Sequence, residues 1–506
     1  MLHGAALFGI EAIPIRIEVN TDRGIAYHLV GLPDSAIKES WYRISAALKN
    51  SGYRMPGKRI TINLAPANLR KEGSAYDLPM AIAILVASAQ IESTLHEKYL
   101  MMGELSLDGS LSPIKGALPI ALMAKEKQFE GLILPMANVG EAAAVEGIGV
   151  FGARNLTQVL QFLKDGRGMK RADPFVTLGR TRDGVGCPHD FEEVIGQETV
   201  KRGMEIAASG GHNVLMVGPP GSGKTMLAKR LPSILPSMTL QEALETTKIH
   251  SVAGKITDRG RILLQRPFRS PHHSASTAAL VGGGAFPLPG EISLAHNGIL
   301  FLDELPEFKK SVLESLRQPL EDRRVIISRT RCTVTYPSSF MLVASMNPGP
   351  AGSHHTEGVE TSSYRERNRY RSRISGPLLD RIDLHIEVFP VPVEQLSARE
   401  KGESSHSIRA RVEEARRIQA KRFEGEEGMH CNAQMSVKEI RKHCILAGGA
   451  RDLLLKAMNN LNLSARAYDR ILKVSRTIAD LSGAEKILPG HVAEAVQYRS
   501  LDREAG

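Results

Sequence analysis

The stretch that decides the fold is the octapeptide Gly218-Pro219-Pro220-Gly221-Ser222-Gly223-Lys224-Thr225. The apolar residues 213–217 precede it and predict a short strand, and residues 224–231 follow with the pattern of a helix. Glycines allow backbone N–H groups to turn inward around phosphate oxygens, and the start of a helix adds positive potential there. We therefore expect this loop to bind ATP, with Lys224 reaching the β- and γ-phosphates and Thr225 holding Mg²⁺.

Two later apolar strands end in polar residues that suit hydrolysis. Residues 298–302 predict a buried strand ending in Asp303 and Glu304, and two carboxylates there are costly unless they meet water or a metal. We expect Asp303 to hold Mg²⁺ and Glu304 to orient or deprotonate the attacking water. Residues 340–345 predict a further strand, which delivers Asn347 to the same water. Asn347 alone would be read as a turn residue, but beside the other motifs it is assigned to the site.

Outward from the loop, the patterns divide the chain into four parts. Residues 191–390 alternate strands with helices, which indicates a mainly parallel α/β sheet. Residues 391–506 keep only helical periodicity and predict a C-terminal helical domain. Residues 164–190 are rich in Gly, Arg, Asp and Pro and are interpreted as a linker. Residues 1–163 mix short strands with helices, which predicts an α+β domain.

Composition narrows the class of protein. The 506 residues carry a formal net charge of +10, which suits a polyanionic partner such as nucleic acid and equally a basic enzyme that binds none. The four cysteines show no CxxC spacing, so we expect no disulfide framework and a cytoplasmic location. The longest apolar run, residues 78–91, is too short to span a bilayer, and residues 1–11 lack the basic region of a signal peptide. We expect no membrane association.

Several longer strings resemble the AAA+ superfamily, its magnesium-chelatase-like branch and, within that branch, the ComM/YifB family. The strings are Val-Gly-Leu-Pro-Asp at 30–34, Phe-Glu-Glu-Val-Ile-Gly-Gln at 191–197, Gly-His-Asn at 211–213, Phe-Arg-Ser-Pro-His-His at 268–273, Pro-Gly-Glu-Ile-Ser-Leu-Ala-His-Asn-Gly at 289–298, Ser-Gly-Pro-Leu-Leu-Asp-Arg-Ile-Asp-Leu at 375–384 and Cys-Asn-Ala at 431–433. They extend over nearly the whole chain. The resemblance implies an α/β AAA+ P-loop domain with a helical lid.

The resemblance also implies a homo-hexameric ring with ATP bound between subunits. Arg381 would be the arginine finger that reaches the neighbour's site, Arg466 the second sensor of the γ-phosphate, and Ile195 would seat the adenine. Both arginines would stabilise charge on the transferring phosphoryl group. Without the family pattern, either arginine would be read as a surface residue or an ion-pair partner. ComM is viewed as a ring helicase that drives branch migration of DNA during natural transformation, so DNA is the implied partner.

The N-terminal domain resembles the proteolytic domain of Lon, through residues 71–73 and 103–109. That peptidase uses a Ser–Lys pair, because the hydroxyl needs a nearby amine as its base. In the matched frame Ala75 takes the place of the nucleophile, with Ser74 one residue away, and Ile120 takes the place of the lysine. We therefore expect a Lon-protease-like α+β fold without peptidase activity.

Two basic segments are candidate nucleic-acid surfaces. Residues 323–336 predict two alternating strands around a basic turn, and a hairpin at this place points into the ring's pore in the same superclade. Arg329 and Arg331 are therefore candidates for gripping DNA phosphates, the alternative being a solvated turn. The Arg-rich segment 365–373, with the adjacent Tyr364, suits stacking on bases and equally a solvated face or a contact between subunits.

Two His-Cys pairs in the C-terminal part of the chain are candidates for a zinc site. His430-Cys431 and His443-Cys444 offer four zinc-type ligands, but adjacent residues point in different directions on any regular element. Buried structural cysteines are the expected outcome.

The leading hypothesis is an ATP-hydrolysing hexameric motor that moves along or unwinds DNA. One alternative is a magnesium-chelatase motor subunit, which shares the ATPase core but would couple to its partner through an Asp-x-Ser-x-Ser adhesion segment that we do not expect here. The other is an ATP-dependent protease or chaperone, which Ala75 and Ile120 disfavour.

Overall fold

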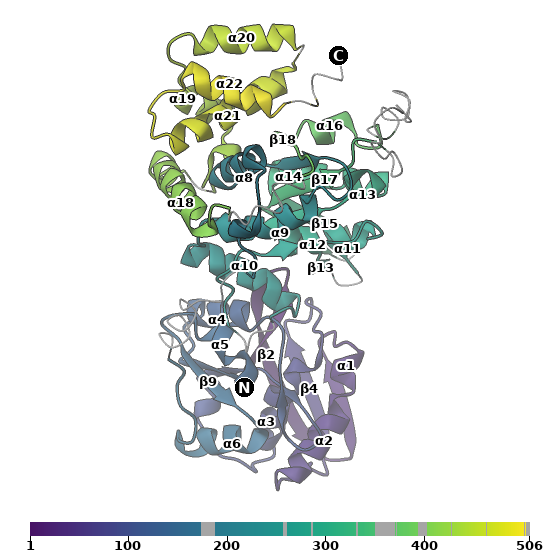
Figure 1. The fold of residues 1–506 in the computed structure, drawn as a ribbon. Coiled ribbons are helices and arrows are strands. Elements are labelled where there is room, and N and C mark those ends of the chain that lie inside the picture. Colours follow the sequence, from purple (N-terminus) through teal and green to yellow (C-terminus); the bar gives the residue numbers. More distant parts are fainter. Residues whose placement is uncertain are drawn as a thin grey trace. The chain divides into compact units, whose positions relative to one another are not determined.

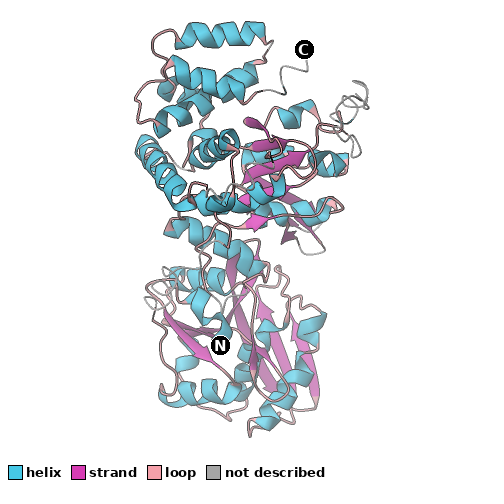
Figure 2. Cartoon of the chain, in the orientation of Figure 1, coloured by secondary structure: helices cyan, strands magenta, loops and turns pink. Residues whose placement is uncertain are grey.

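The computed structural model describes residues 1–173, 188–256, 261–284, 287–329, 332–349, 370, 372–392, 402–426, 428–461, 463–499 and 501. The chain forms two compact units, Met1–Gly184 with Leu240–Leu264, and Val185–Thr239 with Gln265–Gly506. Figures 1 and 2 trace the helices and strands of both units. In the part of the chain that the structure describes, no helix is both long enough and apolar enough to cross a membrane.

A seven-stranded sheet with the order β3-β4-β2-β1-β5-β8-β9 forms the first unit. Its strands are β1 (Leu2–Phe8), β2 (Glu11–Asp22), β3 (Ala26–Val30), β4 (Arg59–Ala65), β5 (Tyr99–Met101), β8 (Gly131–Pro135) and β9 (Gly149–Ala153). Strand β2 pairs antiparallel with β1 and β4, and the other neighbours are parallel. Ile15 and Ile17 are buried and Arg16 between them is exposed, as the alternation of a strand requires.

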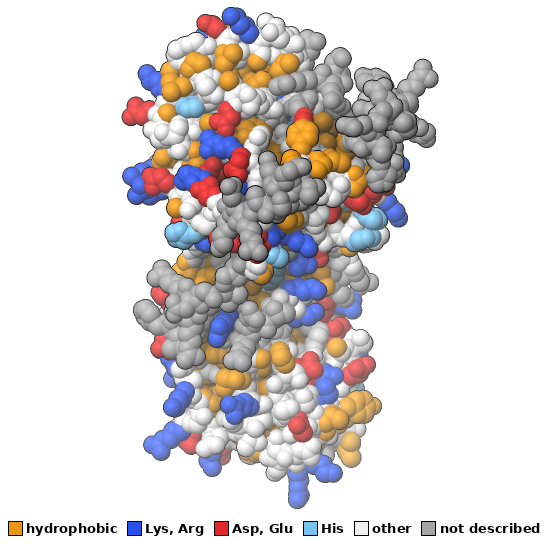
Figure 3. All heavy atoms as spheres, in the orientation of Figure 1, with side chains coloured by type: hydrophobic (Ala, Val, Ile, Leu, Met, Phe, Trp, Pro, Cys, Tyr) orange, Lys and Arg blue, Asp and Glu red, His pale blue; other side chains and the backbone are white. Residues whose placement is uncertain are grey.

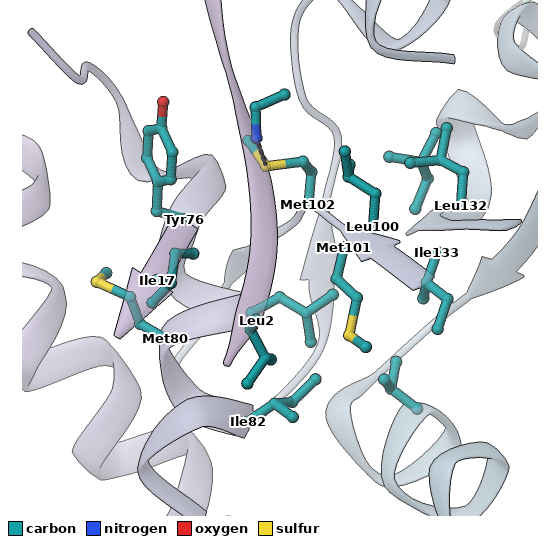
Figure 4. Packing of buried hydrophobic residues seen from close by; sticks show 14 of the residues in the cluster. Leu2, Ile17, Tyr76, Met80, Ile82, Leu100, Met101, Met102, Leu132 and Ile133 are labelled. Carbon is teal, nitrogen blue, oxygen red and sulfur yellow. Dashed lines mark hydrogen bonds between the residues drawn. The ribbon is translucent and has the colours of Figure 1, made fainter. Parts of the chain in front are cut away.

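The helices of the first unit supply the rest of its core. They are α1 (Ser35–Lys38), α2 (Ser40–Asn50), α3 (Asp77–Ala87), α4 (Ala117–Glu126), α5 (Val139–Ala142) and α6 (Leu156–Asp165). Helices α3 and α4 pack against β2. Figure 4 shows the result, with Ile17 of β2, Met80 and Ile82 of α3, and Leu132 of β8 among the buried side chains. The predicted mixture of strands and helices is present in this region, in a mixed sheet with four parallel and two antiparallel pairings.

Helix α10 (Leu240–Val252) also belongs to the first unit, although its residues lie inside the predicted ATPase range. Gly116 N donates to Ser251 O at 3.1 Å, and Leu244 packs against the first unit's core. Burial raises the pKa of Glu141, and hydrogen bonds from Ser251 and Asn138 oppose that shift. The sequence did not indicate that α10 belongs to the first unit, because an amphipathic pattern does not show which core a helix covers.

Five parallel strands in the order β11-β14-β17-β10-β18 form the sheet of the second unit. They are β10 (Val214–Val217), β11 (Phe268–Arg269), β14 (Ile299–Leu302), β17 (Met341–Met346) and β18 (Leu384–Glu387). Every residue of β14 and β17 is buried. Parallel strands covered on both faces carry continuous apolar runs, as these two strands do. The parallel sheet predicted from the alternation of strands with helices is present.

Helices surround this sheet and continue to the end of the chain. Helix α8 (Glu198–Gly210) packs against β18, and α9 (Lys224–Ile234) packs against β17. The later helices are α18 (Ser405–Arg422), α19 (Val437–His443), α20 (Ala450–Asn460), α21 (Ala465–Leu481) and α22 (Pro489–Gln497), of which α19 to α22 gather together in Figure 1. Helix α21 begins where the Ser464 side chain accepts a hydrogen bond from Ala467 N. The predicted helical region lies in the same compact unit as the sheet.

The predicted linker, residues 164–190, is partly structured. Ala172 N donates to Val150 O at 2.8 Å, so the chain is still bound to the first unit there. Asp190 caps the short helical turn Phe191–Glu193 by accepting from Glu192 N. Residues 174–187 lie outside the described part of the chain.

Candidate active site

The glycine loop, Asp303, Glu304 and Asn347 meet at one edge of the five-stranded sheet. Strands β10, β14 and β17 are neighbours and parallel, so the residues that follow them lie at the same edge. Strand β10 leads into the glycine loop, β14 into Asp303 and Glu304, and β17 into Asn347. The structure therefore brings together the groups that the sequence predicted separately.

Lys224 lies at the centre of this edge. Its Nζ donates to Gly218 O at 2.7 Å, to Pro219 O at 2.8 Å and to Asn347 Oδ1 at 3.2 Å. Burial lowers the pKa of Lys224, and the charges of Asp303 and Glu304 partly offset that shift. A flexible ammonium among exchangeable oxygen partners suits a group that binds phosphate oxygens.

The glycines of the loop are required by close approach and by backbone conformation. A Cβ on Gly218 would stand 2.2 Å from Val388 O, and Gly221 and Gly223 have φ of +77° and +90°. No larger side chain fits at Gly218 unless the loop moves away from the end of β18.

Thr225 and Asp303 form a pair of oxygen ligands. Thr225 Oγ1 donates to Asp303 Oδ2 at 2.7 Å, and the other Asp303 oxygen accepts from the Ser345 hydroxyl. Hydroxyl and carboxylate oxygens are the donors that Mg²⁺ prefers, so these residues fit the metal. Thr225 and Asp303 would hold Mg²⁺, which neutralises charge on the phosphates when bound.

Glu304 lies beside this pair with its side chain about half exposed, at 53%. Its φ of 54° places the backbone in the left-handed region, and its N–H donates to Ser345 Oγ at 3.1 Å. His273 Nδ1 lies 3.9 Å from Glu304 Oε2. An exposed carboxylate with a constrained backbone is suited to contact a water molecule at the sheet edge.

The segment around Ile195 is attached to the same loop. Gln197 Nε2 donates to Ser222 O at 3.1 Å and to Phe389 O at 3.2 Å. Ile195, which is half-buried, therefore lies two residues from a side chain bound to the glycine loop. This is compatible with the predicted contact to the adenine.

The predicted arginine finger, Arg381, and the predicted second sensor, Arg466, both have partners within this chain. Arg381 is buried, at 8% exposure, and its guanidinium donates to Glu321 and to Pro377 O. Arg466 is largely exposed and pairs with Asp380 at 3.2 Å. These partners are Glu321, Pro377 and Asp380, and none of them belongs to the glycine loop.

The predicted basic hairpin is confirmed as β15 (Arg324–Arg329) and β16 (Cys332–Pro337). Arg329 is exposed at its tip, and Arg331 lies outside the described residues. The Tyr336 hydroxyl donates to Pro287 O at 2.6 Å, which holds the hairpin against the preceding loop. On the face drawn in Figure 3, basic side chains are dispersed with acidic ones among them, so the net charge alone does not locate a partner.

The Arg-rich segment 365–373 is described only at Tyr370, Ser372 and Arg373. Tyr370 is buried, at 6% exposure, and the Arg373 guanidinium lies 5.6 Å from the centre of its ring. Burial raises the pKa of Tyr370 to about 12. This tyrosine is therefore placed for packing rather than for stacking on a base.

Buried cysteine is the reading that the structure supports at the His-Cys pairs. Cys431 and Cys444 are buried free thiols, and burial raises the pKa of Cys444 to about 12. Within the described residues, no group of three or more His, Cys, Asp and Glu side chains is placed to hold a metal.

In the first unit, the Ser74 hydroxyl donates to the Glu104 carboxylate. Ala75 follows it in the same helical turn, and Ile120 is buried on α4. Neither of these positions carries a nucleophile or a base, so this region offers no Ser–Lys pair at the matched positions.

The expectation that no Asp-x-Ser-x-Ser string occurs was wrong, because residues 108–112 have that spacing. The string lies in the turn between β6 (Glu104–Leu105) and β7 (Leu111–Ser112), and Asp108 Oδ1 accepts from Ser110 N at 2.9 Å and Ser110 Oγ at 2.7 Å. The aspartate thus caps its own turn.

Three residues of the site were missed from the sequence. Ser345 binds Asp303, His273 approaches Glu304, and Glu321 binds Arg381. A hydroxyl inside the apolar run 340–345 was a usable signal for Ser345, since a fully buried strand has little reason to carry one. Nothing local distinguished Glu321 from other acidic residues of an exposed helix.

Comparison with known proteins identifies the family. Residues 190–396 match the family described as magnesium chelatase, subunit ChlI, residues 17–138 match subunit ChlI of Mg-chelatase, and residues 402–499 match the C-terminal part of subunit ChlI. The YifB protein of Salmonella typhimurium is 45% identical over 506 residues, which cover 99% of this chain and 97% of that protein. Competence protein ComM of Haemophilus influenzae is 44% identical over 505 residues, covering 99% and 98%. Lon protease 2 of Bacillus subtilis is 26% identical over 149 residues, covering 28% and 26%. This chain belongs to the ComM/YifB family of magnesium-chelatase-like AAA+ proteins.

Proposed function

We propose that this chain hydrolyses ATP in a Mg²⁺-dependent reaction. The observation that carries the proposal is the meeting of Lys224, the Thr225–Asp303 pair and Asn347 at one sheet edge. Lys224 binds the β- and γ-phosphates, and Glu304 and Asn347 align the attacking water.

We infer that the working form is a homo-hexameric ring, in which Arg381 of one subunit completes the neighbour's site. The family and the position of Arg381 beside β18 support this proposal. To reach a neighbour, the Arg381 guanidinium exchanges Glu321 for the phosphates. Mass measurement in solution with ATP tests the ring, and a chain that stays monomeric at all concentrations contradicts it.

We further propose that the ring moves along DNA and drives branch migration during recombination. The exposed Arg329 on the β15–β16 hairpin supports a phosphate contact, and the ComM relative is named a competence protein. The formal net charge of +10 is compatible with the same partner.

The deciding experiment measures the ATPase rate with and without single-stranded and branched DNA, with Glu304→Gln as the inactive control. DNA should stimulate the ATPase rate of the wild type. Arg329→Ala should weaken DNA binding and reduce the magnitude of the slope of log K for DNA against log salt concentration by about 1. Arg417→Ala, an exposed arginine on α18, is the matched control and should leave both unchanged. An ATPase that ignores every DNA tested and separates no strands would eliminate the DNA proposal and leave the ATPase proposal intact.

A second candidate is the motor subunit of a magnesium chelatase, which the three family matches favour. In the Asp108 string that such a subunit would use for coupling, Asp108 Oδ1 accepts from Ser110 N and Ser110 Oγ within the turn. An ATPase indifferent to DNA but stimulated by a porphyrin would favour this candidate.

We also propose that the first unit has a Lon-protease-like fold without peptidase activity. The match to Lon protease 2 supports the fold, and Ala75 and Ile120 support the loss of activity. Purified protein incubated with casein and ATP should leave casein intact. Casein cleavage that disappears in Ser74→Ala would instead favour an ATP-dependent protease.

A further inference from the structure

The loop that carries Arg381 is held on both sides by one helix. Asp380 precedes Arg381 and pairs with Arg466 at 3.2 Å, and Asp383 follows it and pairs with Arg470. Arg466 and Arg470 are four residues apart on α21, so they project from the same face. The helix therefore grips the loop at two points, one turn apart.

In the second pair, Arg470–Asp383, the aspartate is buried and has several further partners. Asp383 is 4% exposed and accepts from Asn213 N at 3.1 Å, and His212 Nδ1 lies 3.4 Å away. Burial opposes the charge of Asp383, but Arg470 and His212 outweigh it and hold the pKa well below its usual range. His212 also reaches α21, where its Nε2 lies 2.8 Å from Thr477 Oγ1. A buried carboxylate with these partners cannot move unless its partners move too.

The same loop is bonded to the strand that leads into the glycine loop. Asn213 immediately precedes β10, and its Nδ2 donates to Arg381 O at 2.9 Å. Asn213 O accepts from Leu384 N at 3.0 Å, and its Oδ1 accepts from Leu342 N of β17 at 2.9 Å. The backbone of Arg381 is therefore tied to both strands that carry the subunit's own Lys224 and Asn347.

We propose that Arg470 and Asp383 are positioning residues, which set where Arg381 is presented to the neighbouring subunit. They do so by locking the loop 380–383 between α21 and the start of β10. This inference rests on the proposed ring, because Arg381 has a role to transmit only if it serves another subunit's site. It predicts that damage to the Arg470–Asp383 pair appears in the neighbour's hydrolysis and not in the subunit's own ATP binding.

Subunit mixing separates the two sites. Arg470→Met keeps the aliphatic stem and removes the charge, and the full chain should lose about 100-fold in kcat, the cost of a misplacement of about 1 Å. The Kd for ATP of the Arg470→Met, Glu304→Gln double variant should stay within about twofold of the Kd of Glu304→Gln alone. Mixing Arg470→Met with Lys224→Ala subunits should restore turnover, because the Lys224→Ala neighbour presents an undisturbed Arg381.

The controls distinguish failure of this inference from failure of the ring. In Arg381→Ala the kcat for ATP should fall about 1000-fold, and mixing with Lys224→Ala subunits should restore turnover. If Arg381→Ala is not restored, the ring proposal fails; if it is restored and Arg470→Met is not, the positioning proposal alone fails. Arg409→Met removes an exposed pair with Glu413 on α18 and should behave as wild type.

A second variant guards against simple misfolding. Arg470→Lys keeps the positive charge beside Asp383 and should show the same restoration with a smaller loss. Loss of the subunit's own ATP binding in both variants would assign Arg470 a structural role and overturn the proposal.

Discussion

The Ser74 region of the first unit and the Asp303 region of the second contain the same kinds of side chain. Lys71 is buried and donates to Pro66 O, Ser74 donates to Glu104, and Arg43 binds Asp77. Each of these polar groups is bound by a partner within the same unit. At the Asp303 edge, by contrast, the Glu304 carboxylate is half exposed, and its nearest basic partner among the described residues, His273 Nδ1, lies 3.9 Å away.

The difference lies in where the strands end. The Asp303 edge collects the carboxyl ends of three adjacent parallel strands, β10, β14 and β17, so its groups face a common space. In the Ser74 region, the groups come from different elements: Ser74 from the helical turn Ser74–Tyr76, Arg43 from α2, Asp77 from α3 and Glu104 from β6. Ser74 binds Glu104, and Arg43 binds Asp77. Residue types therefore identify a catalytic site only together with the element that presents them.

The largest effect on ATP turnover is expected from Gly218→Ala in the second unit, and Gly73→Ala in the first unit is its control. Gly218→Ala places a Cβ 2.2 Å from Val388 O and must displace the loop, so kcat/KM for ATP should fall by about 100-fold. Gly73→Ala, at φ +79° with open space around it, should cost about 1 kcal/mol of stability and leave ATP turnover unchanged. Steady-state ATPase assays check both, and equal effects at the two glycines would contradict the contrast.

A smaller loss is expected when the hydroxyl behind Asp303 is removed. Ser345→Ala deletes the donor to Asp303 and should lower ATPase activity about tenfold, with a higher Mg²⁺ requirement, because partners of metal ligands tune the metal. A Mg²⁺ titration of the ATPase rate measures this. Ser209→Ala is the matched control, since Ser209 Oγ is buried and has no partner among the described residues. An unchanged Mg²⁺ requirement in Ser345→Ala would remove Ser345 from the site.

The Ser74 region should also respond to pH. Burial raises the pKa of Glu72 from 4.5 to about 7, so the folded state binds more protons than the unfolded state between these values. The free energy of unfolding of the first unit should therefore fall as pH rises through that window and stay level above it. Denaturant unfolding followed by the fluorescence of Trp41, the chain's one tryptophan, reports on this unit.

The matching substitution is Glu72→Gln, which mimics the protonated carboxyl. It should remove the fall in stability between about pH 6 and 7, whereas the fall below pH 6 also involves Asp77, whose pKa burial raises from 3.8 to about 6. Glu126→Gln, at an exposed carboxyl of α4, should leave the dependence as in wild type. A fall in stability that persists between about pH 6 and 7 in Glu72→Gln would assign that fall to another group.

The smallest effect is expected from Ser74→Ala. The hydroxyl donates to Glu104 in a half-buried setting, so its removal should change the stability of the first unit by about 1 kcal/mol. The ATPase rate should not change. A tenfold loss of ATPase activity in this variant would mean that the Ser74 region acts on the nucleotide site.

Much of the fold and the centre of the site were predictable from the sequence because their signals are local. The strand–loop–helix order around Gly218 and the apolar runs before Asp303 and Asn347 each depend on a few consecutive residues. The helical periodicity of residues 391–506 is local as well, and α21 (Ala465–Leu481) is one of the helices found there.

Only the tertiary structure decided which residues meet across long distances. Ser345 and Asp303 are 42 positions apart and Arg466 and Asp380 are 86 apart, and no periodicity marks such pairs. It also decided that α10 packs into the first unit although its sequence lies beyond the glycine loop. The physical reason is that side-chain spacing shows which face of an element is apolar, whereas its partner is set by the packing of the whole core.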